Sequence, residues 1–392
     1  MGRSIGGVES HLRPQWIRGR ASRQAHADLP DGTVEEEHGR EGFSGPASHL
    51  YRLHPPTGWI SIDGPLRPHA LDANRLVDGA GDGEVAAADL PTALLGNDDL
   101  VISFWSRPAG TPDWFYRDAD GDLLYLVHQG EGRLETEYGP LPYRASDYLL
   151  VPRGTTHRFA ATAPTQLLAV EAVNGRLELP DRGLLGRHAL FDPAILDVPE
   201  PEPVDEAGEF PIRVKRENQV TTVVYPHHPC DVVGWKGDLA PLRLSIHDFR
   251  PVTSARYHVP PSAHTTFVGS QFVVATFAPR PLETDPAVLR VPFYHRNIDY
   301  DEVIFYHRGE FFSRAGITEG MLTFHPTGIH HGPQPKAVER SQEKGPGGFA
   351  DEIAVNIDAR RPLHLTGAGA SISVEGYDRS WQPEPSGDGS GR

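Results

Sequence analysis

A Pro-x-Gly turn followed three residues later by a histidine occurs twice in the chain. The first copy is Pro152-Arg153-Gly154 with His157, and the second is Pro326-Thr327-Gly328 with His331. In each copy, segments that read as a pair of strands precede the turn. A supersecondary unit repeated at the same internal spacing indicates an internal duplication. We therefore expect two domains of similar fold.

Short segments rich in aromatic and β-branched residues fill most of the chain between turn residues. The 392 residues include 41 glycines and 37 prolines, which is typical of all-β domains with tight turns. A stretch rich in proline and acidic residues divides the chain and reads as a linker. The predicted parts are an N-terminal arm, a first β domain, the linker, a second β domain and a disordered tail: 1–40, 41–195, 196–211, 212–376 and 377–392.

The charge and the cysteine content exclude several classes of protein. The formal net charge of −16 argues against nucleic acid and against an anionic membrane surface as partners. No apolar run is long enough to span a membrane. The single cysteine, Cys230, rules out an intrachain disulfide and a cysteine zinc cluster, and it favours a reducing, cytoplasmic setting.

Two spaced motifs in the second domain resemble the metal-binding motifs of the cupin superfamily, whose fold is a small β-barrel. One is His295-x-Asn297-x4-Glu302-x6-Gly309, and the other is Gly320-x5-Pro326-x-Gly328-x2-His331. This resemblance, together with the duplication, implies an all-β bicupin fold with two β-barrel or jelly-roll domains. Asn297 stands where cupins carry a second histidine, which favours three protein ligands over four.

The choice between the two neighbouring acids follows from the spacing. Only Glu302 lies at the motif's distance from Gly309, and Asp301 is one residue out of register. A slip of one residue turns a strand side chain to the opposite face, so Glu302 is expected to face the barrel interior. His295, Glu302 and His331 then form the two-histidine, one-carboxylate set of non-haem Fe(II) oxygenases.

The first domain keeps the fold pattern without the ligands. Arg117 and Ala119 stand where ligands would be needed, so this domain is expected to be a scaffold. A histidine on a strand is more often a hydrogen-bonded structural residue than a ligand. We give that structural interpretation to His128, His157, His188 and His364, and also to His330, which should point away from His331.

Several segments together resemble homogentisate 1,2-dioxygenase. They are "FYHRN", "DEVIFYHRGEF", "HPTGIHHGP", "DVVGWKG" (231–237) and "YHVPPSAHTTF" (257–267). The resemblance implies Fe(II), cleavage of a diphenol ring by O2 to give 4-maleylacetoacetate, aromatic amino acid catabolism, and a trimer or hexamer. It places a catalytic acid/base at His258 and places His325, Phe311, Tyr294 and Asn297 near the substrate.

Two departures from the family pattern bear on the substrate. One extra residue separates His295 from Glu302, and Phe311 replaces a tyrosine that lies near the substrate in the family. Losing that hydroxyl removes a hydrogen bond worth about 0.5–1.5 kcal/mol. Gentisate or a substituted hydroquinone therefore stays open as the substrate beside homogentisate.

Two other classes of cupin remain as alternatives. One is a metal-dependent isomerase, often with zinc, although the replacement by Asn297 counts against its usual four-ligand site. The other is a bicupin storage or binding protein, although such proteins usually lack the ligands in both barrels. Metal content separates the three classes: iron indicates an oxygenase, zinc an isomerase, and no metal a binding protein.

Overall fold

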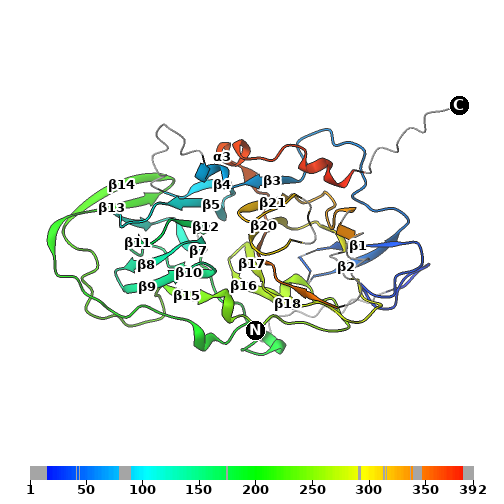
Figure 1. Ribbon diagram of the computed structural model, residues 1–392, viewed down its shortest axis with the longest axis horizontal. Coiled ribbons are helices and arrows are strands. Elements are labelled where there is room, and N and C mark those ends of the chain that lie inside the picture. The colour runs from blue at the N-terminus through cyan, green and yellow to red at the C-terminus, as the bar shows by residue number, and fades with distance from the viewer. Residues whose placement is uncertain are drawn as a thin grey trace, which may run out of the picture.

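The computed structural model describes residues 16–382, except 41, 44, 79–89, 174, 290–292, 312–313, 315, 336 and 339–346. Two β-barrels lie side by side along the longest axis (Figure 1). Strands make up most of the regular structure in this part of the chain, and the prediction of an all-β bicupin is confirmed.

The first barrel consists of a seven-stranded and a six-stranded sheet. In spatial order, the seven-stranded sheet contains β15 (Leu242–Ser245), β10 (Asp147–Val151), β7 (Gly121–Gln129), β12 (Thr165–Val173), β5 (Leu100–Arg107), β4 (Thr92–Gly96) and β24 (His364–Leu365). The six-stranded sheet contains β14 (Gln219–His227), β13 (Ala207–Arg216), β6 (Phe115–Asp118), β11 (His157–Ala161), β8 (Glu131–Thr136) and β9 (Gly139–Arg144).

The second barrel is built on another six-stranded sheet and two smaller ones. The large sheet contains β16 (Thr265–Val268), β17 (Phe272–Phe277), β23 (Ile353–Ala359), β20 (Asp301–Arg308), β21 (Met321–His325) and β3 (His69–Asp72). The smaller sheets contain β19 (Tyr294–Asn297), β1 (Val34–Gly39) and β2 (Ala47–Arg52), and β18 (Arg280–Pro281) and β22 (Phe349–Ala350).

The two barrels share one hydrophobic core. On β7, Leu124 and Leu126 face this shared core, whereas Tyr125 and Val127 face the interior of the first barrel. Successive strand side chains point to opposite faces, so a strand buried on both sides reads as a continuous apolar run. On β20, Val303 and Phe305 pack into the same shared core from the second barrel. This packing turns the alternate residues of β20, Glu302 among them, away from the first barrel.

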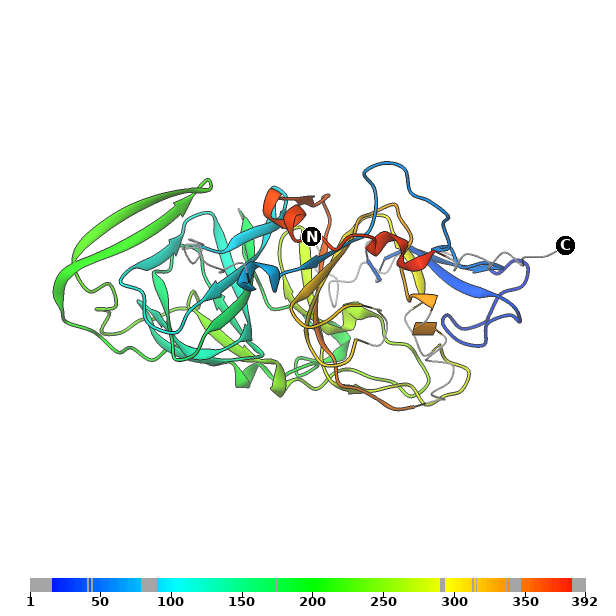
Figure 2. The same cartoon turned by 45° about the horizontal axis from the view of Figure 1, so that its top comes forward.

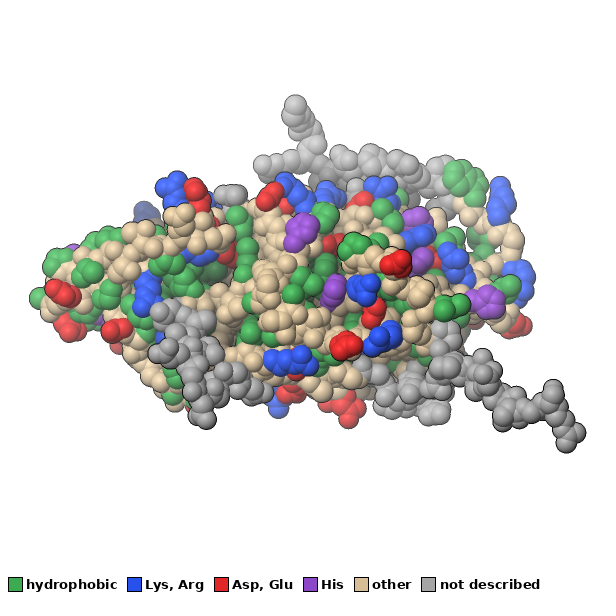
Figure 3. Space-filling model, turned by 90° about the horizontal axis from the view of Figure 1, so that it is seen from above, with side chains coloured by type: hydrophobic (Ala, Val, Ile, Leu, Met, Phe, Trp, Pro, Cys, Tyr) green, Lys and Arg blue, Asp and Glu red, His purple; other side chains and the backbone are tan. Residues whose placement is uncertain are grey.

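Helices are few and short in the described part of the chain. They include α1 (Arg75–Asp78), α3 (Gly367–Ser371), η1 (Gly183–Leu185), η2 (Pro193–Ile195), η3 (Ile246–Asp248), η4 (Pro261–His264) and η5 (Tyr377–Trp381). Within those residues, no helix has the length and apolarity needed to cross a membrane. On the face shown in Figure 3, basic and acidic side chains are interspersed.

The N-terminal region departs from the predicted boundaries. β1, inside the predicted arm, pairs in parallel with β19 of the second barrel. β2 and β3, inside the predicted first domain, also belong to sheets of the second barrel. β1 is not predicted from the sequence because Glu35–Glu37 is a polar run. In the structure its carboxylates are buried and paired with His26, Arg52 and His330 from elsewhere in the chain.

Parts of the predicted linker and of the predicted second domain belong to the first barrel. β13 begins within the predicted linker and pairs in parallel with β6 of the first barrel, while β14 extends the same sheet (Figure 2). Ile212 on β13 packs with Phe115 and Cys230 in a small apolar cluster, which accounts for this pairing. β15 and β24, also inside the predicted second domain, complete the seven-stranded sheet of the first barrel.

The beginning of the predicted disordered tail is ordered. η5 buries Tyr377 and Trp381, and Trp381 Nε1 donates to the carbonyl of Gly332, 3.2 Å away. Two large aromatic side chains that find a core and hydrogen-bond partners order this turn. The rest of the tail, 383–392, lies outside the described residues.

Candidate metal centre and its cavity

Three adjacent pieces of backbone position the predicted ligands. His295 lies on β19 and exchanges two backbone hydrogen bonds with His331, with N···O distances of 2.9 and 3.1 Å. Glu302 lies near the start of β20 and stands opposite His325 of β21 in the ladder. These two pairings bring His331 to the two ligands that precede it by 36 and 29 residues, His295 and Glu302.

His295, Glu302 and His331 form a compact buried group. Their nearest ligand atoms all lie within 4.8 Å of one another. His295 Nε2 is 3.6 Å from Glu302 Oε2, and His331 Nε2 is 3.6 Å from Glu302 Oε1. Both distances are too long for hydrogen bonds, so the three side chains converge without satisfying one another.

The hydrogen bonding of the two imidazoles suits a metal ion. Each Nδ1 faces a backbone carbonyl, that of Phe293 at 3.3 Å for His295 and that of Ile329 at 3.5 Å for His331. A proton on Nδ1 leaves the Nε2 lone pair aimed at the centre. His331 Nε2 is buried and has no hydrogen-bond partner. Burial, with His295 nearby, lowers the pKa of His331 to about 3, so its imidazole is neutral, as a ligand must be.

A second row of residues holds Glu302 in place. His325 Nδ1 lies 2.8 Å from Glu302 Oε1, and His325 Nε2 lies 3.1 Å from the hydroxyl of Tyr377. Burial alone would raise the pKa of Glu302, but His331, His295 and His325 outweigh it and hold that pKa well below its usual value. The carboxylate is therefore ionised and fixed in orientation.

Asp301 has a different role from its neighbour. Its two carboxylate oxygens accept backbone N–H groups from Thr327 and Leu363, both at 2.7 Å. Asp301 thereby fixes the turn that leads to His331 and the segment that follows β23. The structure thus turns Glu302 toward the histidines and Asp301 away from them.

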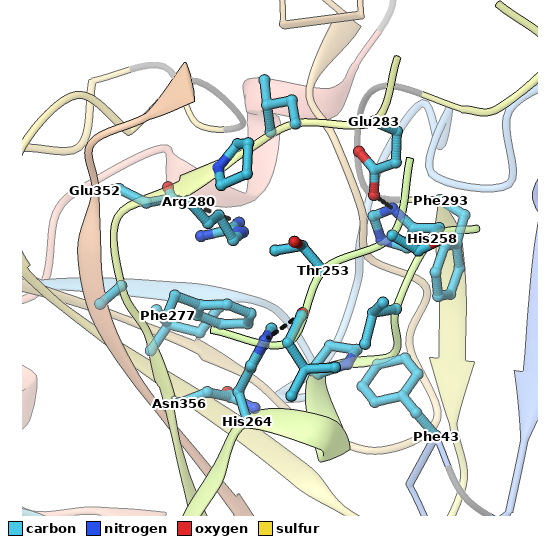
Figure 4. Close-up of a pocket in the computed structure, with 18 of the residues that line it drawn as sticks. Phe43, Thr253, His258, His264, Phe277, Arg280, Glu283, Phe293, Glu352 and Asn356 are labelled. Atoms are coloured by element: carbon cyan, nitrogen blue, oxygen red, sulfur yellow. Dashed lines mark hydrogen bonds and ion pairs between the residues drawn. The ribbon is translucent and has the colours of Figure 1, made fainter. Parts of the chain in front are cut away.

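A cavity opens beside this centre, and its wall includes His295 and Glu302. Figure 4 shows His258 on one side of the cavity, with Phe293 beside it and Glu283 pointing toward it. His258 Nδ1 lies 3.0 Å from Glu283 Oε1, so Nε2 is the ring nitrogen left for a proton exchange. Phe43 and Phe293 give this side of the cavity an apolar lining.

The opposite part of the wall carries a cation. Arg280, on β18, lines the cavity, and its Nη2 lies 2.9 Å from Glu352 Oε1. Burial raises the pKa of Glu352, although Arg280 opposes that shift. A guanidinium in a cavity can bind a carboxylate group with two parallel hydrogen bonds.

The residues predicted to contact substrate occupy other places. Four of them, His325, Phe311, Tyr294 and Asn297, are buried but do not line the cavity. Phe311 packs edge-on against Tyr306, with ring centroids 4.8 Å apart. Asn297 Oδ1 accepts the backbone N–H of Asp299 at 3.2 Å. Their roles in substrate binding stay predictions.

The sequence interpretation missed four residues that the structure brings to the site. Glu283 pairs with His258, Tyr377 supports His325, and Arg280 lines the cavity. Asp358 lies across the ladder from Glu302, and burial, with repulsion from Glu302, raises its pKa to about 7. Each acts through a partner at least 25 positions away in the chain, which no local spacing could indicate.

The corresponding region of the first barrel is filled by a hydrogen-bond network. His157 is fully buried between the Thr155 carbonyl, 3.0 Å from Nδ1, and the Tyr125 hydroxyl, 3.1 Å from Nε2. Arg117 donates to Thr156. An acidic group nearby, Asp118, Asp120 and Glu171, is bridged by the ammonium of Lys215.

Comparisons with known proteins cover both barrels. Residues 91–246 match the family described as Homogentisate 1,2-dioxygenase N-terminal, and residues 254–386 match Homogentisate 1,2-dioxygenase C-terminal. Among solved structures, a cupin 2 conserved barrel domain protein from Leptotrichia buccalis aligns with 78% of this chain and 100% of its own, at 10% identity and a TM-score of 0.33. At that identity and TM-score, the likeness supports no statement about the function of this chain.

Individual relatives agree with the family match. A protein of Saccharolobus solfataricus named "Putative dioxygenase" is 35% identical over 90% of this chain and 94% of its own length. Homogentisate 1,2-dioxygenases of Sinorhizobium fredii and Rhizobium leguminosarum bv. trifolii are each 28% identical. They align with 67% and 82% of this chain, and the chain spans 60% and 72% of their lengths. The chain belongs to the homogentisate 1,2-dioxygenase family, a family of dioxygenases.

Proposed function

We propose that the protein is a non-haem Fe(II) dioxygenase that cleaves the ring of homogentisate with O2 to give 4-maleylacetoacetate. The observation that carries this proposal is a two-histidine, one-carboxylate centre on the wall of a cavity that also holds His258. His295, Glu302 and His331 would hold the metal. When bound, Fe(II) supplies the binding of the phenolate and the activation of O2.

His258 is proposed to move the phenolic proton. Glu283 at Nδ1 fixes the orientation of the ring, and Nε2 takes the proton as the phenol binds and returns one later. Histidine suits both steps because its unperturbed pKa lies near neutrality. A positioned general base of this kind contributes about 10²–10⁴-fold in rate.

Arg280 is proposed to select an acidic ring substrate. Its place on the cavity wall allows it to pair with the acetate group of homogentisate, with Glu352 fixing its guanidinium. Gentisate also carries a carboxylate, whereas a hydroquinone without an acidic substituent does not. A measured preference for acidic diphenols over unsubstituted hydroquinone would support this role of Arg280.

The test is oxygen uptake by protein reconstituted with Fe(II) under anaerobic conditions, with homogentisate and then gentisate or hydroquinone added. We expect uptake and a ring-cleavage absorbance with homogentisate. His258→Gln should keep its iron and lose about 10²–10⁴-fold in turnover. Uptake only with another diphenol would change the proposed substrate. Iron-loaded protein without uptake, or native protein with zinc bound at His295, Glu302 and His331, would overturn the oxygenase assignment.

The setting of the enzyme is part of the same proposal. We infer a role in tyrosine and phenylalanine catabolism, a cytoplasmic location and a trimer or hexamer, all on family resemblance and on the single cysteine. Cys230 is buried, and burial raises the pKa of its thiol to about 12, so it is a poor nucleophile.

A further inference from the structure

A second cluster of histidines and carboxylates lies against the cavity wall, where the ring centroid of His26 is 3.9 Å from that of Phe293 and 5.9 Å from that of His258. It contains His26, Glu35, Glu37 and His49. His26 Nε2 lies 3.3 Å from Glu37 Oε2, and His49 Nε2 lies 3.2 Å from the same oxygen. His26 Nδ1 lies 3.3 Å from Glu35 Oε2. None of these residues belongs to the catalytic set.

The strand geometry explains how the cluster forms. Glu35 and Glu37 are two residues apart on β1, so they point to the same face, and their ladder partners on β2 are Tyr51 and His49. Glu36 points to the other face, where Arg52 and His330 pair with it. The same three-residue acidic run thus serves two separate environments.

The two faces of β1 differ in how their charge is neutralised. Glu36 has two arginines within ion-pair distance, Arg52 and Arg296. In the described part of the chain, Glu35 and Glu37 have no arginine or lysine within that distance, and their ion-pair partners are histidines. Glu35 also accepts the His26 backbone N–H at 2.9 Å and the Tyr51 hydroxyl at 3.3 Å. Both carboxylates are almost fully buried. A divalent cation would neutralise both carboxylates while the two imidazoles stay neutral.

The separations between ligand atoms fit a small transition-metal ion. Zinc bound at about 2.0 Å in a tetrahedron separates its ligand atoms by about 3.3 Å. The His26–Glu37 and His49–Glu37 separations of 3.3 and 3.2 Å match that edge. His26 is 6% exposed, its Nε2 faces Glu37, and its Nδ1 faces Glu35 at ion-pair distance without making a hydrogen bond.

His26 has an unusual backbone conformation, and its ring packs against the cavity wall. His26 has a φ of 63°, in the left-handed region that few non-glycine residues occupy. Its ring stacks on Phe293 at a centroid distance of 3.9 Å, and Phe293 lies two residues before His295. An ion held by His26 would therefore tie the N-terminal segment to the strand that carries a catalytic ligand.

We propose that His26, Glu37 and His49, with Glu35 beside them, bind a second divalent transition-metal ion of the Zn²⁺ type. The ion is structural: it closes the N-terminal segment against β1 and β2 and supports the cavity wall at Phe293. This proposal does not depend on the reaction catalysed at the neighbouring centre.

The test uses Glu302→Ala protein, in which the catalytic centre has lost its carboxylate. Calorimetric titration of chelator-treated protein with Zn²⁺ should give one equivalent per chain, and Co²⁺ should give the absorption bands of a tetrahedral site. Adding His49→Gln or Glu37→Gln in this background should remove that equivalent. His38→Gln, on the opposite face of β1, is the matched control and should retain it.

Folding is checked by thermal unfolding of each variant. Zn²⁺ should raise the melting temperature of Glu302→Ala protein, and it should leave that of the variant with the added His49→Gln unchanged. His49 is 26% exposed at its side chain, so the fold should tolerate this substitution. Absence of Zn²⁺ binding by folded Glu302→Ala protein, or binding that survives both His49→Gln and Glu37→Gln, would overturn the proposal and leave the cluster an ion-pair network.

Discussion

Adjacent acids at the start of β20 serve different purposes, and substitution separates them. Glu302→Ala should abolish Fe(II) binding at this centre, because no other carboxylate in the set replaces it. Asp301→Ala should keep the iron but lower the free energy of unfolding by about 1–3 kcal/mol, because one buried and one partly buried N–H group lose their acceptor. Iron content and denaturant unfolding of both variants check this. Iron lost from folded Asp301→Ala protein but kept in Glu302→Ala would show that the register is wrong.

The aromatic residue at position 311 differs from the family tyrosine, and the structure limits what this difference can do. Phe311 packs among Tyr306, Ile317 and Met321, and it lies behind Tyr306, which lines the cavity, without lining the cavity itself. Phe311→Tyr should therefore leave the ratio of kcat/KM for homogentisate and gentisate unchanged and should destabilise the fold by about 1–3 kcal/mol if the hydroxyl finds no partner. A change of tenfold or more in that ratio would contradict this and place residue 311 at the substrate.

At the scale of elements, η5 supports the metal centre from the end of the described chain. Tyr377→Phe removes the hydroxyl that lies 3.1 Å from His325 Nε2, so the imidazole that orients Glu302 loses a partner. Loss of such an outer contact typically weakens metal binding by about 10–100-fold. Anaerobic Fe(II) titration measures this effect.

A matched variant isolates the effect on the metal from a general loss of stability. Tyr148→Phe removes another buried tyrosine hydroxyl, 2.8 Å from Thr276, in the shared core between the barrels. It should destabilise the fold to a similar extent without changing the Fe(II) affinity. Equal affinities for wild type and Tyr377→Phe would show that η5 does not support the centre.

The elements also show which parts of the fold the sequence could predict. Runs such as Leu123–Val127 and the Pro-x-Gly turns are local signals, and the strands and candidate ligands that depend on them could be proposed in advance. β1 could not, because a run of three acids reads as solvent-exposed until its partners from distant segments are known. The same holds for Tyr377 and Glu283, whose roles depend on residues 52 and 25 positions away.

At the scale of the whole molecule, the two barrels meet at a buried pair of histidines. His128 on β7 and His307 on β20 have their Nδ1 atoms 2.9 Å apart, and His307 Nε2 lies 2.8 Å from the Ser146 hydroxyl. Burial lowers the pKa of His128 to about 4, and burial with His128 nearby lowers that of His307 to about 3. Protonation of either ring would place a charge in this buried contact between the barrels.

This histidine pair should make the packing between the two barrels less stable at acidic pH. Each folded pKa lies below the unfolded value of 6.5, so the stabilisation is complete above pH 6.5 and is lost as the pH falls toward 4. For His128 alone the loss corresponds to about 3 kcal/mol. The double variant His128→Asn/His307→Asn should be less stable at pH 7.5, yet its free energy of unfolding should fall less steeply between pH 6.5 and 4.5. His188→Asn, an exposed control, should keep the wild-type slope, and an unchanged slope in the double variant would place the acid sensitivity elsewhere.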